Sequence, residues 1–106
     1  MAYSKAYLFT DPEGVSHVIA GYGKALAHPV RVLITLFLSE HGPRFHQEIQ
    51  SFIGLSNATV SHHLRFLVRY GVIEAKIMGT YIEYSLNNAN LPVMRAYLLD
   101  FLNELN

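Results

Sequence analysis

The sequence predicts a mostly helical α+β domain with five helices and a β-hairpin between the fourth helix and the fifth. Apolar residues recur at helical spacing in segments that glycine, proline and asparagine separate, which indicates short amphipathic helices. From Val72 to Leu86 the residues change to valine, isoleucine, threonine and tyrosine, and Met78-Gly79 interrupts them, as in a hairpin. A chain of 106 residues is enough for one core, so residues 1–106 are predicted to form a single domain.

The composition restricts the class of protein. Apolar residues make up 51% of the chain and charged residues only 15%, so some apolar surface is expected to lie in a subunit interface. The absence of cysteine excludes disulfides and thiolate metal sites. The longest apolar stretch, Val30 to Leu38, is far shorter than the roughly 20 residues of a membrane span. Met1 to Thr10 does not resemble a signal peptide, and we therefore expect a cytoplasmic protein without membrane contact.

The first third of the chain predicts an arm and two helices. Residues 1–13 have no clear period and are interpreted as an N-terminal arm. A first helix follows from one stripe of apolar residues at helical spacing, which are Val15, Val18, Ile19, Tyr22 and Leu26. Pro29 is tolerated in a first helical turn, and the apolar run after it predicts a second helix. Since that helix is apolar over most of its circumference, we expect it at the centre of the domain.

Residues 45–69 predict two helices joined by a short turn. The third helix is expected to bury one face, made of Phe45, Ile49, Phe52 and Ile53. Gly54 can adopt the positive φ that ends a helix, and Ser56 is a good N-cap for a fourth helix over residues 57–69. In that helix the core-facing positions are Val60, Leu64 and Leu67. The opposite face is polar and basic, with Ala58, His62, Arg65 and Arg69.

The hairpin spans residues 72–86, and a last helix over residues 91–105 follows it. Asn90 is predicted to cap this helix, with Pro92 in its first turn. Its apolar stripe needs a surface to cover it and consists of Leu91, Met94, Leu98, Phe101 and Leu102.

Two helices joined by a tight turn and followed by a hairpin are typical of the winged helix-turn-helix, which places its second helix in the major groove of DNA. We therefore predict binding to double-stranded DNA. The candidate contacts are Ser56, Asn57, Ala58, Thr59, Ser61, His62, His63, Arg65, Arg69 and Lys76. The formal net charge is zero, but residues 57–82 hold two arginines and one lysine against Glu74 alone, which allows a local basic face.

Three segments resemble the ArsR/SmtB-type repressors. They are residues 24–31 (KALAHPVR), residues 54–64 (GLSNATVSHHL), and Tyr70-Gly71-Val72-Ile73 with Gly79 and Tyr84-Ser85-Leu86. The likeness runs from about residue 15 to residue 103. It implies a homodimeric transcriptional repressor in which the first and last helices form the interface. It also implies that the fourth helix enters the major groove and that the wing approaches the minor groove.

The chain departs from that family in two places. Members that sense metals commonly carry a Cys-x-Cys pair where this chain has Phe45 and Gln47, and the other usual site needs histidines that are missing from residues 91–106. We therefore expect no metal and no cofactor. In the wing, Ile77, Met78 and Thr80 stand where relatives often have basic residues, so Lys76 is the one cation and the salt dependence of binding should be modest.

Several alternatives stay open. The neutral charge and the apolar composition also suit a winged-helix module for protein–protein association. An unknown small-molecule effector could bind a pocket lined by Tyr3, Tyr7, Phe9, Tyr97 and Phe101. Protonation of His62 and His63 on the DNA face would tighten binding at acid pH.

Two classes of site are disfavoured by the positions of the histidines. A histidine metal site is disfavoured because His62 and His63 point about 100° apart on a helix and the other four lie in different elements. Catalysis is not expected, because Ser61 and His62 are neighbours on one helix and cannot form a nucleophile–base pair.

Overall fold

The computed structural model describes residues 14–105, which form five helices and three strands. The helices are α1 (Val15–Ala25), α2 (Pro29–His41), α3 (His46–Ile53), α4 (Asn57–Arg69) and α5 (Leu91–Glu104). The strands are β1 (Arg44–Phe45), β2 (Ile73–Met78) and β3 (Tyr81–Leu86). The predicted fold class, five helices with a β-hairpin before the last, is confirmed. The predicted N-terminal arm lies outside the described residues.

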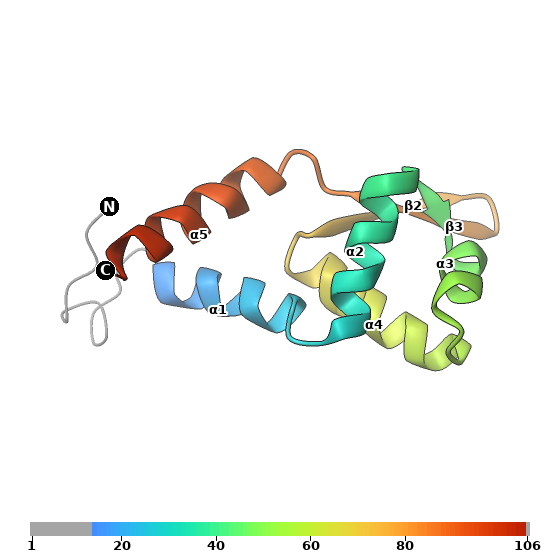
Figure 1. Cartoon of the computed structure of the whole chain (residues 1–106). Coiled ribbons are helices and arrows are strands. Elements are labelled where there is room, and N and C mark those ends of the chain that lie inside the picture. Colours follow the sequence, from blue (N-terminus) through green and yellow to red (C-terminus); the bar gives the residue numbers. More distant parts are fainter. Residues whose placement is uncertain (1–13, 106) are drawn as a thin grey trace.

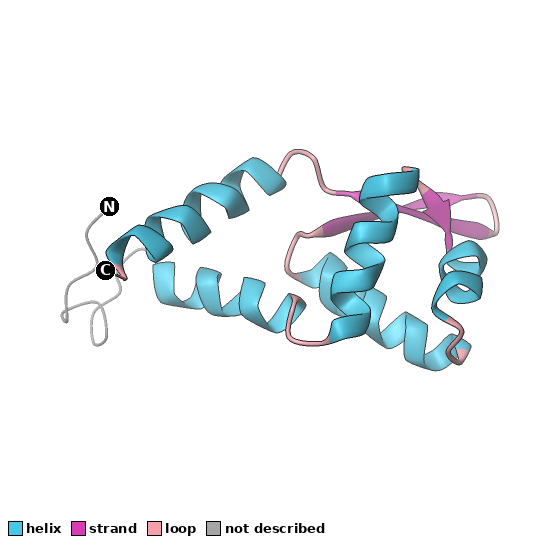
Figure 2. Ribbon diagram, viewed as in Figure 1, coloured by secondary structure: helices cyan, strands magenta, loops and turns pink. Residues whose placement is uncertain are grey.

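A body and a two-helix arm make up the described chain (Figure 1). Helices α2, α3 and α4 pack with the sheet, whose strands lie on one side of the helices (Figure 2). Helices α1 and α5 project from this body, and the ring of Tyr22 on α1 meets Tyr97 on α5 edge-on at 6.4 Å. The protein is accordingly elongated, measuring 47 × 24 × 22 Å.

The core lies between α2, α3, α4 and the sheet. Its fully buried side chains include Ile34 and Leu38 from α2, Ile49 from α3, Leu64 and Leu67 from α4, and Ile73 from β2. The apolar positions of α4 therefore lie inside, as its period predicts. For α2 the expectation of a fully central helix is wrong, because Val32, Leu33 and Leu36 are exposed along its outer face.

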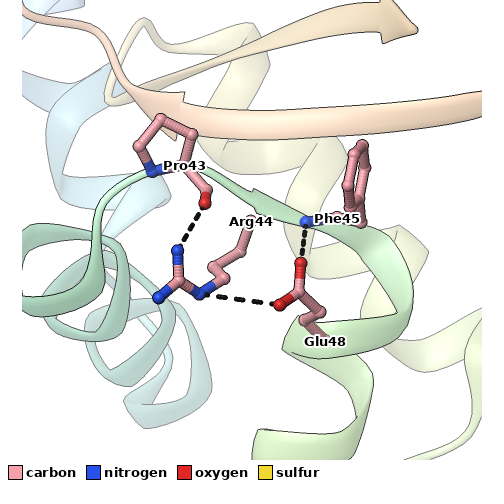
Figure 3. Close-up of polar contacts among 4 residues, drawn as sticks. All are labelled: Pro43, Arg44, Phe45 and Glu48. Atoms are coloured by element: carbon pink, nitrogen blue, oxygen red, sulfur yellow. Dashed lines mark hydrogen bonds and ion pairs between the residues drawn. The ribbon is translucent and has the colours of Figure 1, made fainter.

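The sheet contains a strand that the sequence did not reveal. Strand order is β1-β3-β2, and β1 pairs antiparallel with β3, with Arg44 opposite Tyr84. A two-residue strand is too short to show an alternating pattern. The next helix begins at once, because Glu48 Oε1 accepts a hydrogen bond from the Phe45 amide at 3.0 Å while Glu48 Oε2 lies 3.7 Å from Arg44 Nε (Figure 3).

Asn90 occupies the N-cap position of α5, but its side chain does not cap the helix. Instead, Asn90 Nδ2 donates to the Gly71 carbonyl at 2.9 Å, and Asn87 Oδ1 accepts from the Asn90 amide at 3.1 Å. The predicted capping bond is thus wrong, because the end of α4 offers an acceptor closer to the side chain. A β-carbon at Gly71, whose φ is +75°, would collide with Asn90 Nδ2.

Arg31 joins α1, α2 and α4 through a buried guanidinium. The residue is 8% exposed; its Nε donates to the Ala25 carbonyl at 2.8 Å and its Nη2 to the Lys24 carbonyl at 2.9 Å, at the C-terminal end of α1. Its Nη1 lies 3.0 Å from His63 Nδ1, and its Cζ lies 4.5 Å from the centre of the Phe66 ring, both on α4. One side chain of α2 therefore sets the positions of two neighbouring helices.

We expect Arg31→Met to lower the free energy of unfolding by about 3 kcal/mol, because methionine leaves the buried Ala25 carbonyl and the His63 Nδ1 atom without the guanidinium donor. Urea unfolding at one fixed protein concentration measures this effect. Arg69→Met is the matched control, since Arg69 is exposed and should cost less than about 0.5 kcal/mol. Equal losses in the two variants would contradict the structural role of Arg31.

Candidate nucleic-acid interface

Helix α4 begins at a side-chain cap. Ser56 Oγ accepts a hydrogen bond from the Thr59 amide at 3.2 Å, so the predicted N-cap is confirmed. The same hydroxyl donates to Thr59 Oγ1 at 2.8 Å. Ser56, Asn57, Ala58 and Thr59 are all exposed, so the first turn of α4 presents small and polar side chains to solvent.

The rest of α4 has one buried face and one free face. Val60, Leu64 and Leu67 are at most 1% exposed, because they pack into the core. His62, Arg65 and Arg69 are exposed on the other side of the helix. Both faces agree with the period of the sequence.

His63 does not belong to the free face. It is only 5% exposed, its Nδ1 lies 3.0 Å from Arg31 Nη1, and its ring lies 4.5 Å from that of His28. Including His63 among the DNA contacts is therefore inconsistent with its position. The sequence could not reveal this, because the partners of His63 lie on α2 and in the turn before α2.

Ser61 is held by a residue that the sequence analysis missed. His46, the first residue of α3, places its Nε2 2.9 Å from Ser61 Oγ. Ser61 is half-buried, and its hydroxyl is oriented by this contact. The two helices of the helix-turn-helix are thereby joined by a polar contact beside the free face of α4. No local pattern in the sequence marks His46 for this position.

A groove of about 590 Å³ separates α4 from the hairpin. Its helical wall includes His62, Arg65, Phe66 and Arg69, and its strand wall contains Ala75 and Tyr84. Burial raises the pKa of Tyr84, while the nearby Arg65 acts in the opposite direction. The tyrosine is thus a neutral phenol at neutral pH, and the groove combines two cations with an uncharged floor.

Lys76 lies apart from this groove. It is exposed on β2, directly opposite Glu83 of β3 in the register. Side chains alternate along a strand, so Lys76 occupies the opposite sheet face from Ala75. The one cation of the wing thus lies beside a carboxylate and away from α4.

The fold brings together histidines that are far apart in the sequence. The rings of His28 and His63 lie 4.5 Å apart, and those of His62 and His63 lie 5.7 Å apart. Within residues 14–105, no three histidine, aspartate or glutamate side chains are placed to share a metal ion. The guanidinium of Arg31 occupies one side of this group by contacting His63 Nδ1.

Two other predictions concern an effector pocket and the membrane. Of the aromatic residues proposed to line an effector pocket, Tyr3, Tyr7 and Phe9 lie outside the described residues, while Tyr97 contacts Tyr22. Among the helices that the structure describes, none is long and apolar enough to cross a lipid bilayer.

Comparison with known proteins identifies relatives over most of the chain. A family model described as "Bacterial regulatory protein, arsR family" matches residues 28–75. A cadmium resistance transcriptional regulatory protein CadC homolog of Staphylococcus aureus is 34% identical over 82 residues, which cover 76% of this chain and 68% of that protein. The transcriptional repressor SdpR of Bacillus subtilis is 33% identical over 81 residues, which cover 76% of this chain and 89% of that one.

Solved structures agree with this result. The solution structure of a homodimeric winged helix-turn-helix DNA-binding domain from Mycobacterium bovis, a possible ArsR-family regulator, has a TM-score of 0.70. It is 27% identical, and the match covers 96% of this chain and 88% of that chain. The helix-turn-helix and the wing are therefore shared with a domain described as homodimeric and DNA-binding.

The lowered pKa of His63 predicts that the folded protein loses stability at acid pH. Burial lowers this pKa below its usual value of 6.5, and the charges of His28, Arg31 and His62 lower it further. The unfolded chain therefore binds a proton at a higher pH than the folded chain does. The stabilisation by neutral His63 is complete well above pH 6.5 and is lost as the pH falls through 6.5 toward the folded pKa.

We expect His63→Asn to flatten the dependence of stability on pH, because Oδ1 of asparagine can still accept a hydrogen bond from Arg31 and does not titrate. Thermal unfolding between about pH 5 and pH 8 measures it. His17→Asn, at an exposed position of α1, should retain the wild-type slope. A parallel slope in His63→Asn and wild type would show that His63 is not the titrating group.

Proposed function

The chain belongs to the arsR family of bacterial regulatory proteins, and on that premise we propose that it is a sequence-specific transcriptional repressor that binds double-stranded DNA as a homodimer. The observation that carries this proposal is the free face of α4. Its small, polar first turn is followed by exposed His62, Arg65 and Arg69, and the hairpin lies beside it. Such side chains reach base edges and phosphates when the helix enters a major groove.

The proposed contact set is narrower than the one predicted from the sequence. It contains Ser56, Asn57, Ala58, Thr59, Ser61, His62, Arg65 and Arg69. His63 is left out because it is buried, and Lys76 contributes little because Glu83 stands opposite. Of the two histidines that the pH-dependent alternative invoked, only His62 is exposed on the free face of α4.

The proposed dimer uses the arm formed by α1 and α5. Exposed apolar residues of α5 and the residue after it supply the surface, and they are Val93, Leu99, Phe101, Leu102 and Leu105. Apolar surface gathered on a projecting helix is a typical subunit interface. A dimer of this kind would set the two α4 helices one turn of DNA apart, about 34 to 36 Å.

The repressor role is supported by the likeness to SdpR, which is named a transcriptional repressor. We propose that this chain regulates without the family's usual metal ligands, because Phe45 and Gln47 are present in place of the cysteine pair and residues 91–106 lack histidine. Selection of bound duplexes from random fragments, with the oligomeric state measured alongside, tests the proposal. Failure to enrich any sequence would overturn it.

A protein-binding module is the second candidate, because of an apolar surface on α2 and α3. Leu33, Leu36 and Phe52 are exposed there, and the Phe52 ring stacks on Phe37 at 4.2 Å. This surface would bind another protein in place of DNA. It predicts a stable complex with a partner and no protected sequence on any duplex.

We expect Arg65→Ala and His62→Ala each to weaken binding to the selected duplex by roughly five- to a hundredfold, since each removes one base or phosphate contact. Fluorescence anisotropy at one fixed salt concentration gives the affinity, and thermal unfolding checks the fold. Glu40→Ala, on the exposed end of α2, should bind like wild type. Full affinity in both α4 variants would contradict the proposed role of this helix.

We expect Leu102→Glu to dissociate the dimer, because it places a charge in the proposed apolar interface. Light scattering during size-exclusion chromatography reports the mass. Leu33→Glu is the matched control on α2, where a similarly exposed leucine lies outside the arm, and it should remain dimeric. A dimeric Leu102→Glu would place the interface elsewhere.

A further inference from the structure

The tip of the wing is unusually apolar for a solvent-exposed hairpin. Ile77 is 79% exposed, Tyr81 is 56% exposed, and Met78 and Ile82 are about 40% exposed. In the register Ile77 stands opposite Ile82, and Met78 stands opposite Tyr81. Scattered exposed apolar residues are ordinary, but four of them gathered at the end of one hairpin indicate a contact surface.

The sheet face that carries Ile77 is the face that meets α4. Side chains alternate, so Ile73, Ala75 and Ile77 of β2 share one face with their partners on β3. Ile73 is buried in the core, and Ala75 lines the groove against α4. Ile77 continues this row toward the end of β2, and the β2–β3 hairpin reaches the end of the molecule opposite the α1–α5 arm (Figure 1).

A second hollow joins the tip to the first turns of α4. It is lined by Asn57 and Ser61 of α4, by Gln47 and Gln50 of α3, and by Ile82 of β3. The apolar pair Ile77–Ile82 is therefore continuous with the polar face that we propose to bind DNA.

The charges of the wing do not favour phosphate contacts. Residues 72–86 contain Glu74, Lys76 and Glu83, so the hairpin has a net charge of −1. Lys76 is opposite Glu83, on the other face from Ile77. A wing of this composition gains little from counterion release, and an apolar contact is the remaining way for it to bind a nucleic acid.

Beyond the major groove, a duplex presents one phosphate ridge and then the minor groove, which is about 6 Å wide. That groove is too narrow for a two-stranded ribbon, but it admits single side chains. Apolar side chains that enter it insert between base pairs, unstack them partly and bend the duplex. The exposed isoleucine at the end of β2 has the chemistry of such a wedge.

We propose that Ile77 of each subunit inserts into the minor groove as an apolar wedge, and that the wing binds DNA in this way and not through phosphates. The inference rests on the proposed function, since it takes α4 as the helix in the major groove. Pyrimidine–purine steps unstack most easily and should therefore be preferred at the wing position.

The test uses the full dimeric chain and a duplex of the selected sequence that carries 2-aminopurine near the wing position. Wild type should raise the 2-aminopurine fluorescence, because the probe brightens when its stacking is lost. Ile77→Ala should abolish this rise and weaken binding about tenfold, as expected for an isoleucine that is no longer buried. Val32→Ala is the control at an exposed β-branched residue on the outer face of α2, away from the hairpin and α4, and it should keep both signals.

The variant Ile77→Lys distinguishes an apolar wedge from a phosphate contact. It should lose the fluorescence change, while the slope of log affinity against log salt concentration should steepen by about one ion pair. Unchanged affinity and fluorescence in Ile77→Ala would overturn the wedge and leave the proposed function intact. Failure of wild type to enrich any duplex would overturn both. Loss of a protein partner by Ile77→Ala, with DNA binding unchanged, would assign the tip to protein association.

Discussion

The buried guanidinium of Arg31 is the interaction on which the arrangement of this protein depends. An arginine stays charged at all accessible pH values and can only donate hydrogen bonds, so every group around it must accept. Two carbonyls at the end of α1 and Nδ1 of His63 on α4 meet this requirement. Because His63 must accept, its proton lies on Nε2 and the ring is neutral. Protonation of the ring would place two cations side by side.

This contact connects the helix proposed for dimerisation with the helix proposed for DNA binding. A second contact also joins α1 to the end of α4. Gly21 of α1 lies so close to Tyr70 that an added β-carbon would be 2.7 Å from the ring. Beside it, Asn90 at the start of α5 donates a hydrogen bond to the carbonyl of Gly71, the residue after Tyr70. Helices α1 and α5 are thus both held to the C-terminal end of α4 and the turn that follows it. In the proposed dimer, a change at the α1–α5 interface would therefore be transmitted to the spacing of the two α4 helices.

The distribution of charge on the surface explains how a chain with zero net charge could bind DNA. Cations gather where α4 faces its groove, with Arg65 and Arg69 on one wall. The wing provides almost no positive charge and instead presents isoleucine, methionine and tyrosine. Affinity for a duplex would then depend on few ion pairs and on more apolar contact, which matches a formal net charge of zero.

The sequence by itself determined the elements whose signals are local. The apolar period of α4, the Ser56 cap and the positive φ of Gly54 are all confirmed, because each depends on residues only a few positions apart. Tertiary structure alone decided which polar side chains are free. His63 is turned inward by Arg31, Ser61 is held by His46, and Asn90 bonds Gly71 in place of its own helix. In each case the partner lies 15 or more residues away, so no spacing within a helix could reveal it.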